Sequence, residues 1–213
     1  METHRVTTAL IVIDVQNDFC PGGALAVEDG DAVVEPCNAL LRSGEFPVTV
    51  LTQDWHPERH SSFASQHEDR QPFTTIEMPY GPQVLWPDHC VIGSRGASIH
   101  KDLASNRADV IVRKGFRAEV DSYSAFFEND HETPTGLHGY LQTRGVKRVV
   151  LAGLATDFCV GFSALDAASL GYEVRVELGA CRAIDLDGSL GTMLDRLREA
   201  GVELTGAKAK TDA

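Results

Sequence analysis

The sequence has little positive charge, no long apolar run and no paired cysteines of the metal-binding type. Lys and Arg number 19 against 31 Asp and Glu, which gives a formal net charge of -12. This charge argues against nucleic-acid binding through phosphate neutralisation and against a basic membrane contact. No apolar run is as long as a membrane span, and the first one reaches Asp14 too early for a signal peptide. We therefore expect a cytoplasmic protein without a nucleic-acid or membrane partner.

The cysteines are five, an odd number, and no two of them form a Cys-x-x-Cys pair. A disulfide framework is therefore not expected. A length of 213 residues with 43% hydrophobic and 23% charged residues suits a globular chain. We expect one domain over residues 1–213, which could form a homo-oligomer.

Short apolar runs alternate with segments of helical periodicity along most of the chain. Strands are predicted over residues 9–15, 48–52, 110–113, 149–154 and 173–176, and helices over residues 31–43, 135–145, 158–171 and 188–201. Continuous apolar strands that alternate with helices are typical of a parallel sheet covered on both faces. We predict a Rossmann-like, three-layer α/β/α fold with a central, mostly parallel sheet.

One segment, about residues 54–106, interrupts this alternation. It is rich in His, Pro, Gly and Ser, and no long periodic pattern runs through it. It also contains five aromatic residues, too many for a disordered segment: Trp55, Phe63, Phe73, Tyr80 and Trp86. Long irregular loops in compact domains are usually functional, so we expect a loop insertion with a binding role. The polar tail, residues 206–213, is expected to be loose.

The strongest single signal is a cysteine at the turn after the apolar run 149–154. Cys159 stands between a predicted strand and a predicted helix, where open α/β sheets place their sites. The N-terminus of a helix favours the thiolate, which is the nucleophilic form. The alternative is a buried cysteine that packs as a small hydrophobe. Because Cys159 lies at the carboxyl end of a strand, we favour a nucleophilic role over a packing role.

Two further polar residues, Asp14 and Lys114, end predicted strands. Burial would raise the pKa of Asp14 and suit it to proton transfer, unless it only caps a turn. Lys114 precedes Gly115 and can reach into a crevice, unless it is a solvated strand end. Because the carboxyl ends of parallel strands share one edge, we expect Asp14, Lys114 and Cys159 to converge.

A candidate metal site follows the strand 48–52. Asp54 and His56 are two residues apart there, and His89 lies later in the irregular segment. One carboxylate and two imidazoles can hold a divalent metal and leave positions open. The alternative is that both histidines are ordinary loop residues. The nearby His60, His67 and Asp88 strengthen the metal hypothesis but leave the ligand assignment open.

Taken together, these motifs resemble the nicotinamidase/pyrazinamidase branch of the isochorismatase-like cysteine hydrolases. The matching pieces are DVQNDF (14–19), QDWHP (53–57), WPDHCV (86–91), RKG (113–115), YSAF (123–126) and GLATDFCV (153–160). They occur in the order found in the family and span nearly the whole chain. Several motifs in one order are far more specific than any single motif.

The resemblance implies a role for each matching position. It implies a catalytic triad of Asp14, Lys114 and Cys159, and metal ligands Asp54, His56 and His89. It implies a cis peptide between Leu154 and Ala155 and an oxyanion hole from the backbone amides of Ala155 and Cys159. It places Phe19, Trp86 and Tyr123 at the substrate. A further metal contact from His60, Ser61 or Ser62 stays open.

The activity implied by the resemblance is hydrolysis of nicotinamide, and also of pyrazinamide, through a cysteine thioester, as a step of NAD salvage. One divalent ion (Zn, Fe or Mn) would bind the pyridine nitrogen. A sibling amidase for carbamoyl or ureido substrates is the nearest rival, but such relatives generally lack the Asp54, His56 and His89 set. A metal-water hydrolase with a structural Cys159 and a non-enzymatic binding protein are two further candidates.

Overall fold

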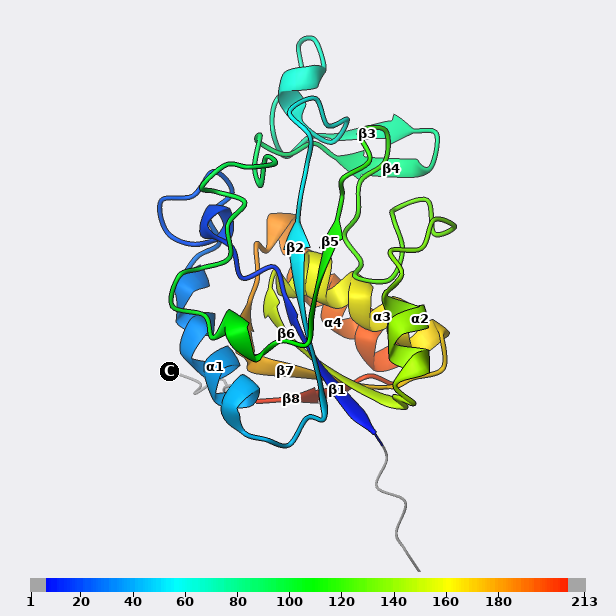
Figure 1. Ribbon diagram of the computed structural model, residues 1–213. Helices are drawn as coiled ribbons and strands as arrows, with labels where there is room; N and C mark the ends of the chain where they lie inside the picture. Colours follow the sequence, from blue (N-terminus) through cyan, green and yellow to red (C-terminus); the bar gives the residue numbers. More distant parts are fainter. Residues whose placement is uncertain (1–6, 207–213) are drawn as a thin grey trace, which may run out of the picture.

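The structure, a computed structural model that describes residues 7–206, is built around a parallel sheet (Figure 1). Within the described residues this sheet has six strands in the order β5-β2-β1-β6-β7-β8, and every neighbouring pair is parallel. The strands are β1 (Thr8–Ile13), β2 (Val48–Asp54), β5 (Val110–Lys114), β6 (Arg148–Leu154), β7 (Glu173–Arg182) and β8 (Glu203–Thr205). The predicted α/β fold with a parallel central sheet is confirmed.

The central strands are apolar on both faces because both faces are covered. β2 is buried along its whole length, and β1 is buried after its first residue. The register places Ala9 of β1 between Val48 of β2 and Val149 of β6. Strands of this kind have no solvated face, which is why their sequences do not alternate between polar and apolar residues.

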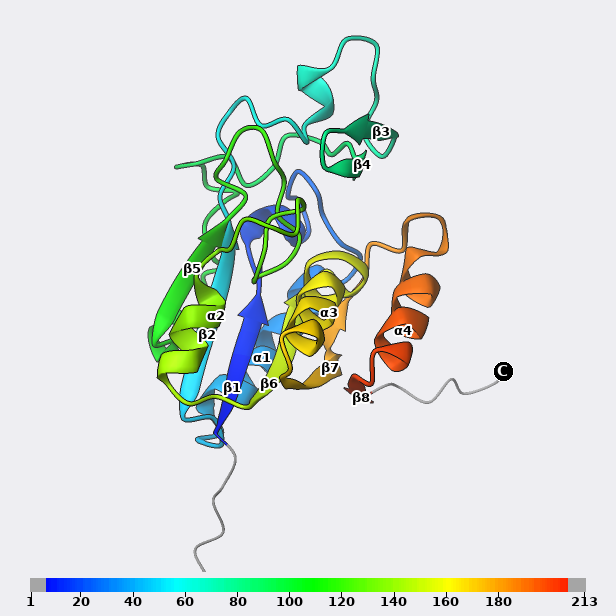
Figure 2. The same ribbon diagram turned by 90° about the vertical axis from the view of Figure 1, so that its right-hand side faces the viewer.

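Helices form a layer on each side of the sheet (Figures 1 and 2). They are α1 (Val34–Arg42), α2 (Leu137–Thr143), α3 (Gly161–Ser169) and α4 (Ser189–Glu199). α1 buries Cys37 and Leu41 in the core on one face, whereas α2, α3 and α4 contribute to the core on the other. All four predicted helices are present, but they are shorter than predicted. Two of them begin in other helical types, the 3-10 helix η2 (Gly30–Val33) and the π-helical turn η5 (Thr156–Val160).

The segment after β2 lies beyond the carboxyl ends of the strands (Figures 1 and 2). It is less irregular than predicted, because β3 (Thr75–Met78) and β4 (Gly81–Val84) form an antiparallel hairpin. The sequence does not reveal this hairpin, whose strands have four residues each and no fully buried face. Short 3-10 helices fill other parts of the chain: η1 (Asn17–Phe19), η3 (Ala64–Gln66), η4 (Ser105–Arg107) and η6 (Leu186–Gly188).

The end of the chain differs from the prediction in two respects. β7 is longer than the predicted strand 173–176, and the three-residue edge strand β8 was not predicted. The tail expected to be loose lies outside the described residues, except for Gly206. Every helix in the described part of the chain is too short or too polar to traverse a bilayer.

Candidate active site

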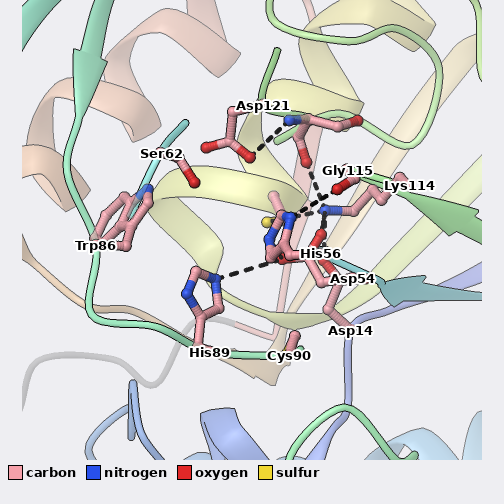
Figure 3. Close-up of polar contacts among 12 residues, drawn as sticks. Asp14, Asp54, His56, Ser62, Trp86, His89, Cys90, Lys114, Gly115 and Asp121 are labelled. Atoms are coloured by element: carbon pink, nitrogen blue, oxygen red, sulfur yellow. Dashed lines mark hydrogen bonds and ion pairs between the residues drawn. The ribbon is translucent and has the colours of Figure 1, made fainter. Parts of the chain in front are cut away.

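Four polar side chains converge at the carboxyl edge of the sheet, and Figure 3 shows three of them, Asp14, Asp54 and Lys114. Asp14 follows β1, Asp54 and Lys114 end β2 and β5, and Cys159 lies in the turn after β6. All four are buried, and the most exposed of them, Cys159, has an exposed fraction of 7%. The register of β2 and β5 places Asp54 directly beside Lys114. The structure thus brings together the three residues that the sequence suggests as catalytic, together with the first of the expected metal ligands.

Lys114 is the central cation of this group. Its Nζ atom lies 2.9 Å from Asp14 Oδ2 and 2.5 Å from Asp54 Oδ1. It also donates to the carbonyl of Ser122 at 2.8 Å and to Cys159 Sγ at 3.4 Å. Burial would lower the pKa of Lys114, but the carboxylates of Asp14 and Asp54 outweigh it and hold this pKa well above its usual value. The ammonium therefore keeps its charge at neutral pH.

Asp14 is held by β2 as well as by the lysine. The Thr52 hydroxyl donates to Asp14 Oδ1 at 2.5 Å and accepts the Asp14 backbone N–H at 3.1 Å. Burial raises the pKa of the Asp14 carboxyl, and the charge of Lys114 only partly opposes this rise. A raised carboxyl pKa is suited to taking and returning a proton near neutral pH.

Cys159 does not have the lowered pKa that its position suggested. Burial raises the pKa of the thiol well above its usual value, Lys114 opposes this, and the carboxylates of Asp14 and Asp54 add to it. The expectation that the turn and Lys114 lower the pKa of this thiol is therefore wrong. Burial thus favours the protonated thiol, and Asp14, whose carboxylate lies within 4.8 Å of the Cys159 sulfur, is the neighbouring group that can accept this proton.

The backbone around the cysteine has two special features. The peptide bond between Leu154 and Ala155 is cis, as the resemblance implies. Residues Thr156–Val160 form a π-helical turn rather than the first turn of an α-helix. The Cys159 carbonyl accepts a hydrogen bond from the Ser163 hydroxyl at 2.6 Å, which anchors the turn to α3.

Three buried donors beside this group form a candidate metal centre. Asp54 Oδ2 lies 3.6 Å from His56 Nε2 and 3.9 Å from His89 Nε2. Asp54, His56 and His89 place their ligand atoms close enough together to share one ion. Although burial opposes it, the charges of Lys114 and His56 hold the pKa of Asp54 well below its usual range. Asp54 therefore offers an anionic oxygen to the metal side of the site.

The hydrogen bonds of the two histidines fit a bound metal. His56 Nδ1 lies 2.8 Å from the Gly115 carbonyl, and His89 Nδ1 lies 2.8 Å from the Pro87 carbonyl. A carbonyl can only accept, so each Nδ1 carries a proton, and Nε2 is the ring nitrogen that each histidine turns toward Asp54 and the candidate metal position. A side chain at position 115 would put its Cβ 2.4 Å from the His56 ring, so the close approach requires glycine. Burial, followed by the charge of His56, lowers the pKa of His89 to about 4, which keeps its imidazole neutral.

Of the candidates that the sequence leaves open for a further metal contact, His60 and Ser62 lie close to this centre. His60 packs against His56 with 4.3 Å between ring centroids, and His60 Nδ1 lies 2.7 Å from Ser62 Oγ. His56, His60 and Asp121 form a second group of neighbouring donors. Ser62 and Asp121 both lie at the histidine side of the site (Figure 3).

A small cavity connects the thiol with the candidate metal centre. Its lining includes Cys159, Ala155, Asp54 and His89, together with the aromatic residues Phe19, Trp86, Tyr123 and Phe158 and with Leu25, Asp121 and Ile184. Trp86 donates its indole N–H to the hydroxyl of Tyr123 at 3.2 Å, and its ring meets that of Phe158 edge to face at 4.9 Å. The arrangement suits a flat ring that carries a group open to nucleophilic attack.

Comparison with known proteins assigns this architecture to a family. The isochorismatase domain matches residues 8–209. The chain belongs to the isochorismatase family. Within it, the nicotinamidase of Acinetobacter baylyi is 51% identical over 92% of this chain and 90% of that protein.

Two solved structures of isochorismatase-like proteins are close to this one. The nicotinamidase pyrazinamidase of Acinetobacter baumannii has a TM-score of 0.91 and 51% identity, over 94% of this chain and 96% of that chain. The pyrazinamidase of Pyrococcus horikoshii, solved in complex with zinc, has a TM-score of 0.75 and 34% identity, over 93% and 98%.

Sequence reasoning missed several residues of this isochorismatase-family pocket. Asp121 lies seven positions after Lys114 in a loop without a motif, and Leu25 and Ile184 lie in other connecting segments, far from it in the sequence. Phe158 stands next to the predicted nucleophile and could have been named as a wall residue from that position. For Leu25, Asp121 and Ile184 the local sequence carries no such signal.

Proposed function

We propose that this protein is a metal-dependent nicotinamidase that hydrolyses nicotinamide to nicotinate and ammonia. One observation carries the proposal: the Cys159 thiol and the candidate metal ligands Asp54 and His89 line the same small aromatic cavity. A pyridine carboxamide has a flat ring, a ring nitrogen and an electrophilic carbon. The names of the similar Acinetobacter proteins, nicotinamidase and nicotinamidase pyrazinamidase, support this substrate.

Acylation begins with proton transfer from Cys159 to Asp14. The sulfur then attacks the amide carbon of the substrate and forms a tetrahedral intermediate. Lys114, which contacts both groups, stabilises the charge as it moves from carboxylate to sulfur and on to the substrate. An ordinary carboxyl group is far too weak a base to take a proton from a thiol. Because the pKa of Asp14 is raised, its carboxylate is a stronger base, and the proton transfer from Cys159 is less unfavourable.

The intermediate collapses when the amide nitrogen takes the proton from Asp14 and leaves as ammonia, which gives a thioester on Cys159. We assign the oxyanion hole to the backbone N–H groups of Ala155 and Cys159. Each such donor typically contributes about 3 kcal/mol to the transition state. A water molecule, deprotonated by Asp14, then cleaves the thioester and releases nicotinate and the free thiol.

The remaining site residues bind and orient the ring. Phe19 and Trp86 would cover its faces, and Tyr123 would close one end of the pocket. Asp54, His56 and His89 would hold one divalent ion, and the zinc complex of the Pyrococcus pyrazinamidase supports this. When bound, the ion supplies a Lewis acid for the ring nitrogen. Fixing the ring in this way places the carboxamide beside the thiol, which is a large part of the rate gain in such sites.

Metal removal tests the whole scheme. We expect the purified protein to release ammonia from nicotinamide, to lose most of this activity when it is stripped with a chelator, and to regain it with added Zn²⁺, Fe²⁺ or Mn²⁺. Ammonia is measured by a coupled assay, and nicotinate by chromatography. The same experiment with pyrazinamide tests whether the pocket accepts the second ring nitrogen.

Two results would change the proposal. Release that survives complete stripping would retain the thiol amidase and remove the metal from the reaction. If folded, metal-loaded protein released no ammonia from nicotinamide, the proposed substrate would be wrong. A carbamoyl or ureido substrate would then be the next to test.

A further inference from the structure

Gln16 and Asp18 follow Asp14 closely in the sequence and have no part in the chemistry proposed above. Gln16 is fully buried, and Asp18 is half-buried beside it. Both side chains form hydrogen bonds to the backbone of other segments rather than to side chains of the site. The segments that they hold are those that carry the candidate metal ligands.

Gln16 is paired with the backbone of Asp54. Its Nε2 donates to the Asp54 carbonyl at 2.9 Å, and its Oε1 accepts the Asp54 N–H at 2.8 Å. The same Nε2 also donates to the carbonyl of Ala97 at 2.8 Å. The side-chain amide therefore makes with Asp54 the same pair of hydrogen bonds that the backbone of a neighbouring strand would make. Its orientation is fixed, because only the NH₂ group can face two carbonyl oxygens.

Asp18 holds the segment of the other two ligands. Its Oδ2 accepts the backbone N–H of Cys90 at 2.7 Å, and its Oδ1 accepts that of Ala24 at 3.1 Å. Cys90 follows His89 directly, and its carbonyl accepts the backbone N–H of His56 at 3.0 Å. Cys90 also has a left-handed backbone, with φ at +47°, which needs support from its surroundings. Through Cys90, one carboxylate is thus linked to both histidines.

The position of Asp18 is set by close packing against Gly96. A Cβ at position 96 would lie 2.0 Å from Asp18 Oδ2. The Asp18 backbone N–H donates to the Gly96 carbonyl at 3.1 Å on the same side. The carboxylate therefore occupies space that only a glycine at position 96 leaves open, beside the backbone N–H groups that it accepts.

We propose that Gln16 and Asp18 are positioning residues that hold Asp54, His56 and His89 in the arrangement that binds the metal. They act through the backbone of the ligands, whereas the carbonyls of Gly115 and Pro87 orient the imidazole rings. The inference rests on the metal-binding part of the proposed function. Mutation of a residue that is hydrogen-bonded to a metal ligand, but does not itself touch the metal, typically lowers metal affinity by about 10–100-fold.

Two isosteric substitutions test the proposal. Gln16→Glu replaces the donating NH₂ with an oxygen that faces the carbonyls of Asp54 and Ala97. Asp18→Asn replaces one accepting oxygen with an NH₂ that faces the N–H of either Cys90 or Ala24. In both variants the shape is kept while hydrogen bonds become repulsions, two in Gln16→Glu and one in Asp18→Asn. The first variant adds a negative charge and the second removes one, so a loss of Zn²⁺ affinity in both reports on the hydrogen bonds and not on the charge.

Asn38→Asp is the matched control. Asn38 is a buried residue of α1 whose amide donates to the Asp102 carbonyl at 2.8 Å and accepts the Ala104 N–H at 2.7 Å. The substitution disturbs a side-chain-to-backbone pair of the same kind, at residues outside the candidate metal centre. It therefore measures how much stability is lost when a buried amide is replaced by a carboxylate that leaves the candidate metal ligands untouched.

The readout is the Zn²⁺ affinity of the metal-depleted, full-length protein, measured by competition with a chromogenic chelator, with Tm recorded for each apo protein. We expect Gln16→Glu and Asp18→Asn to bind Zn²⁺ about 10–100-fold more weakly than the parent, and Asn38→Asp to bind it as the parent does at a lower Tm. Parent-like affinity in both site variants would overturn the proposal. If Asp18→Asn does not fold, Asp18→Ser, which removes the carboxylate without adding an NH₂, is judged by the same criterion.

This readout is independent of the proposed reaction. If the protein binds Zn²⁺ but does not hydrolyse nicotinamide, the affinities still decide whether Gln16 and Asp18 position the ligands. If the parent itself binds no Zn²⁺, the proposal fails, whereas ammonia release still tests the amidase activity. The absorption spectrum of the Co²⁺-loaded protein adds a measure of ligand geometry, which a merely structural role would leave unchanged.

Discussion

A Cys159→Ala variant is expected to bind the metal as the parent does while its kcat for nicotinamide falls by on the order of 10⁴-fold or more. The methyl group cannot attack the amide carbon, so the acyl-enzyme cannot form. The metal ligands keep their own hydrogen bonds to Gly115 and Pro87. The measurement combines steady-state ammonia release with metal content of the purified variant.

Cys37→Ala is the control for the loss of a buried thiol. Cys37 lies in α1, its exposed fraction is 0%, and it is not among the residues that line the cavity. We expect it to lose stability but to keep the parent kcat. The thiol mechanism is contradicted if Cys159→Ala retains a kcat within about tenfold of the parent. A metal-water hydrolase in which Cys159 is structural would then be the better explanation.

The residues at the strand ends could be predicted from sequence because their placement depends on one rule. Asp14, Lys114 and Cys159 each follow or end an apolar strand, and parallel strands bring their carboxyl ends to one edge. The metal candidates Asp54 and His56 belong to the same class, since they leave β2 at that edge. His89 was harder to place: the residues suggested it as the third ligand, but the other histidines and acids nearby left the assignment open until the family resemblance selected it.

Residues that reach the site from loops could not be predicted in this way. Asp121 is placed by a hydrogen bond from Gln83 of the unpredicted β4, at 2.8 Å. Ile184 is placed by its backbone N–H, which donates to the buried carboxylate of Asp157 at 3.0 Å. Both contacts join segments that are far apart in the sequence, so no local pattern shows them.

The pKa of Cys159 was mispredicted for a related reason. A helix N-terminus and a nearby lysine are visible in the sequence, and both favour the thiolate. The burial of Cys159 and the two carboxylates around Lys114 become visible only in the structure, and they raise the pKa of the thiol. The charge balance of the site therefore depends on one lysine placed between two acids.

Lys114→Met is consequently expected to abolish turnover and to lower the free energy of unfolding by about 3–5 kcal/mol. The substitution leaves the buried carboxylates of Asp14 and Asp54 without their shared cation. For a chain of this length the loss corresponds to a fall in Tm on the order of 10 °C. Urea unfolding of metal-free parent and variant measures it. Arg148→Met, which removes an exposed ion pair with Glu173, is the control and should cost at most about 1 kcal/mol.

The double variant Lys114→Met/Asp14→Asn separates the two roles of the lysine. The amide introduced at position 14 carries no charge, so one of the two uncompensated carboxylates is gone and the double variant should be more stable than Lys114→Met alone. Its activity should stay lost, because neither the cation nor the proton acceptor for Cys159 is present. If the second substitution lowered stability further, repulsion between Asp14 and Asp54 would not be the cause of the loss. If Lys114→Met unfolded like the parent, the buried charges would be compensated by groups other than Lys114.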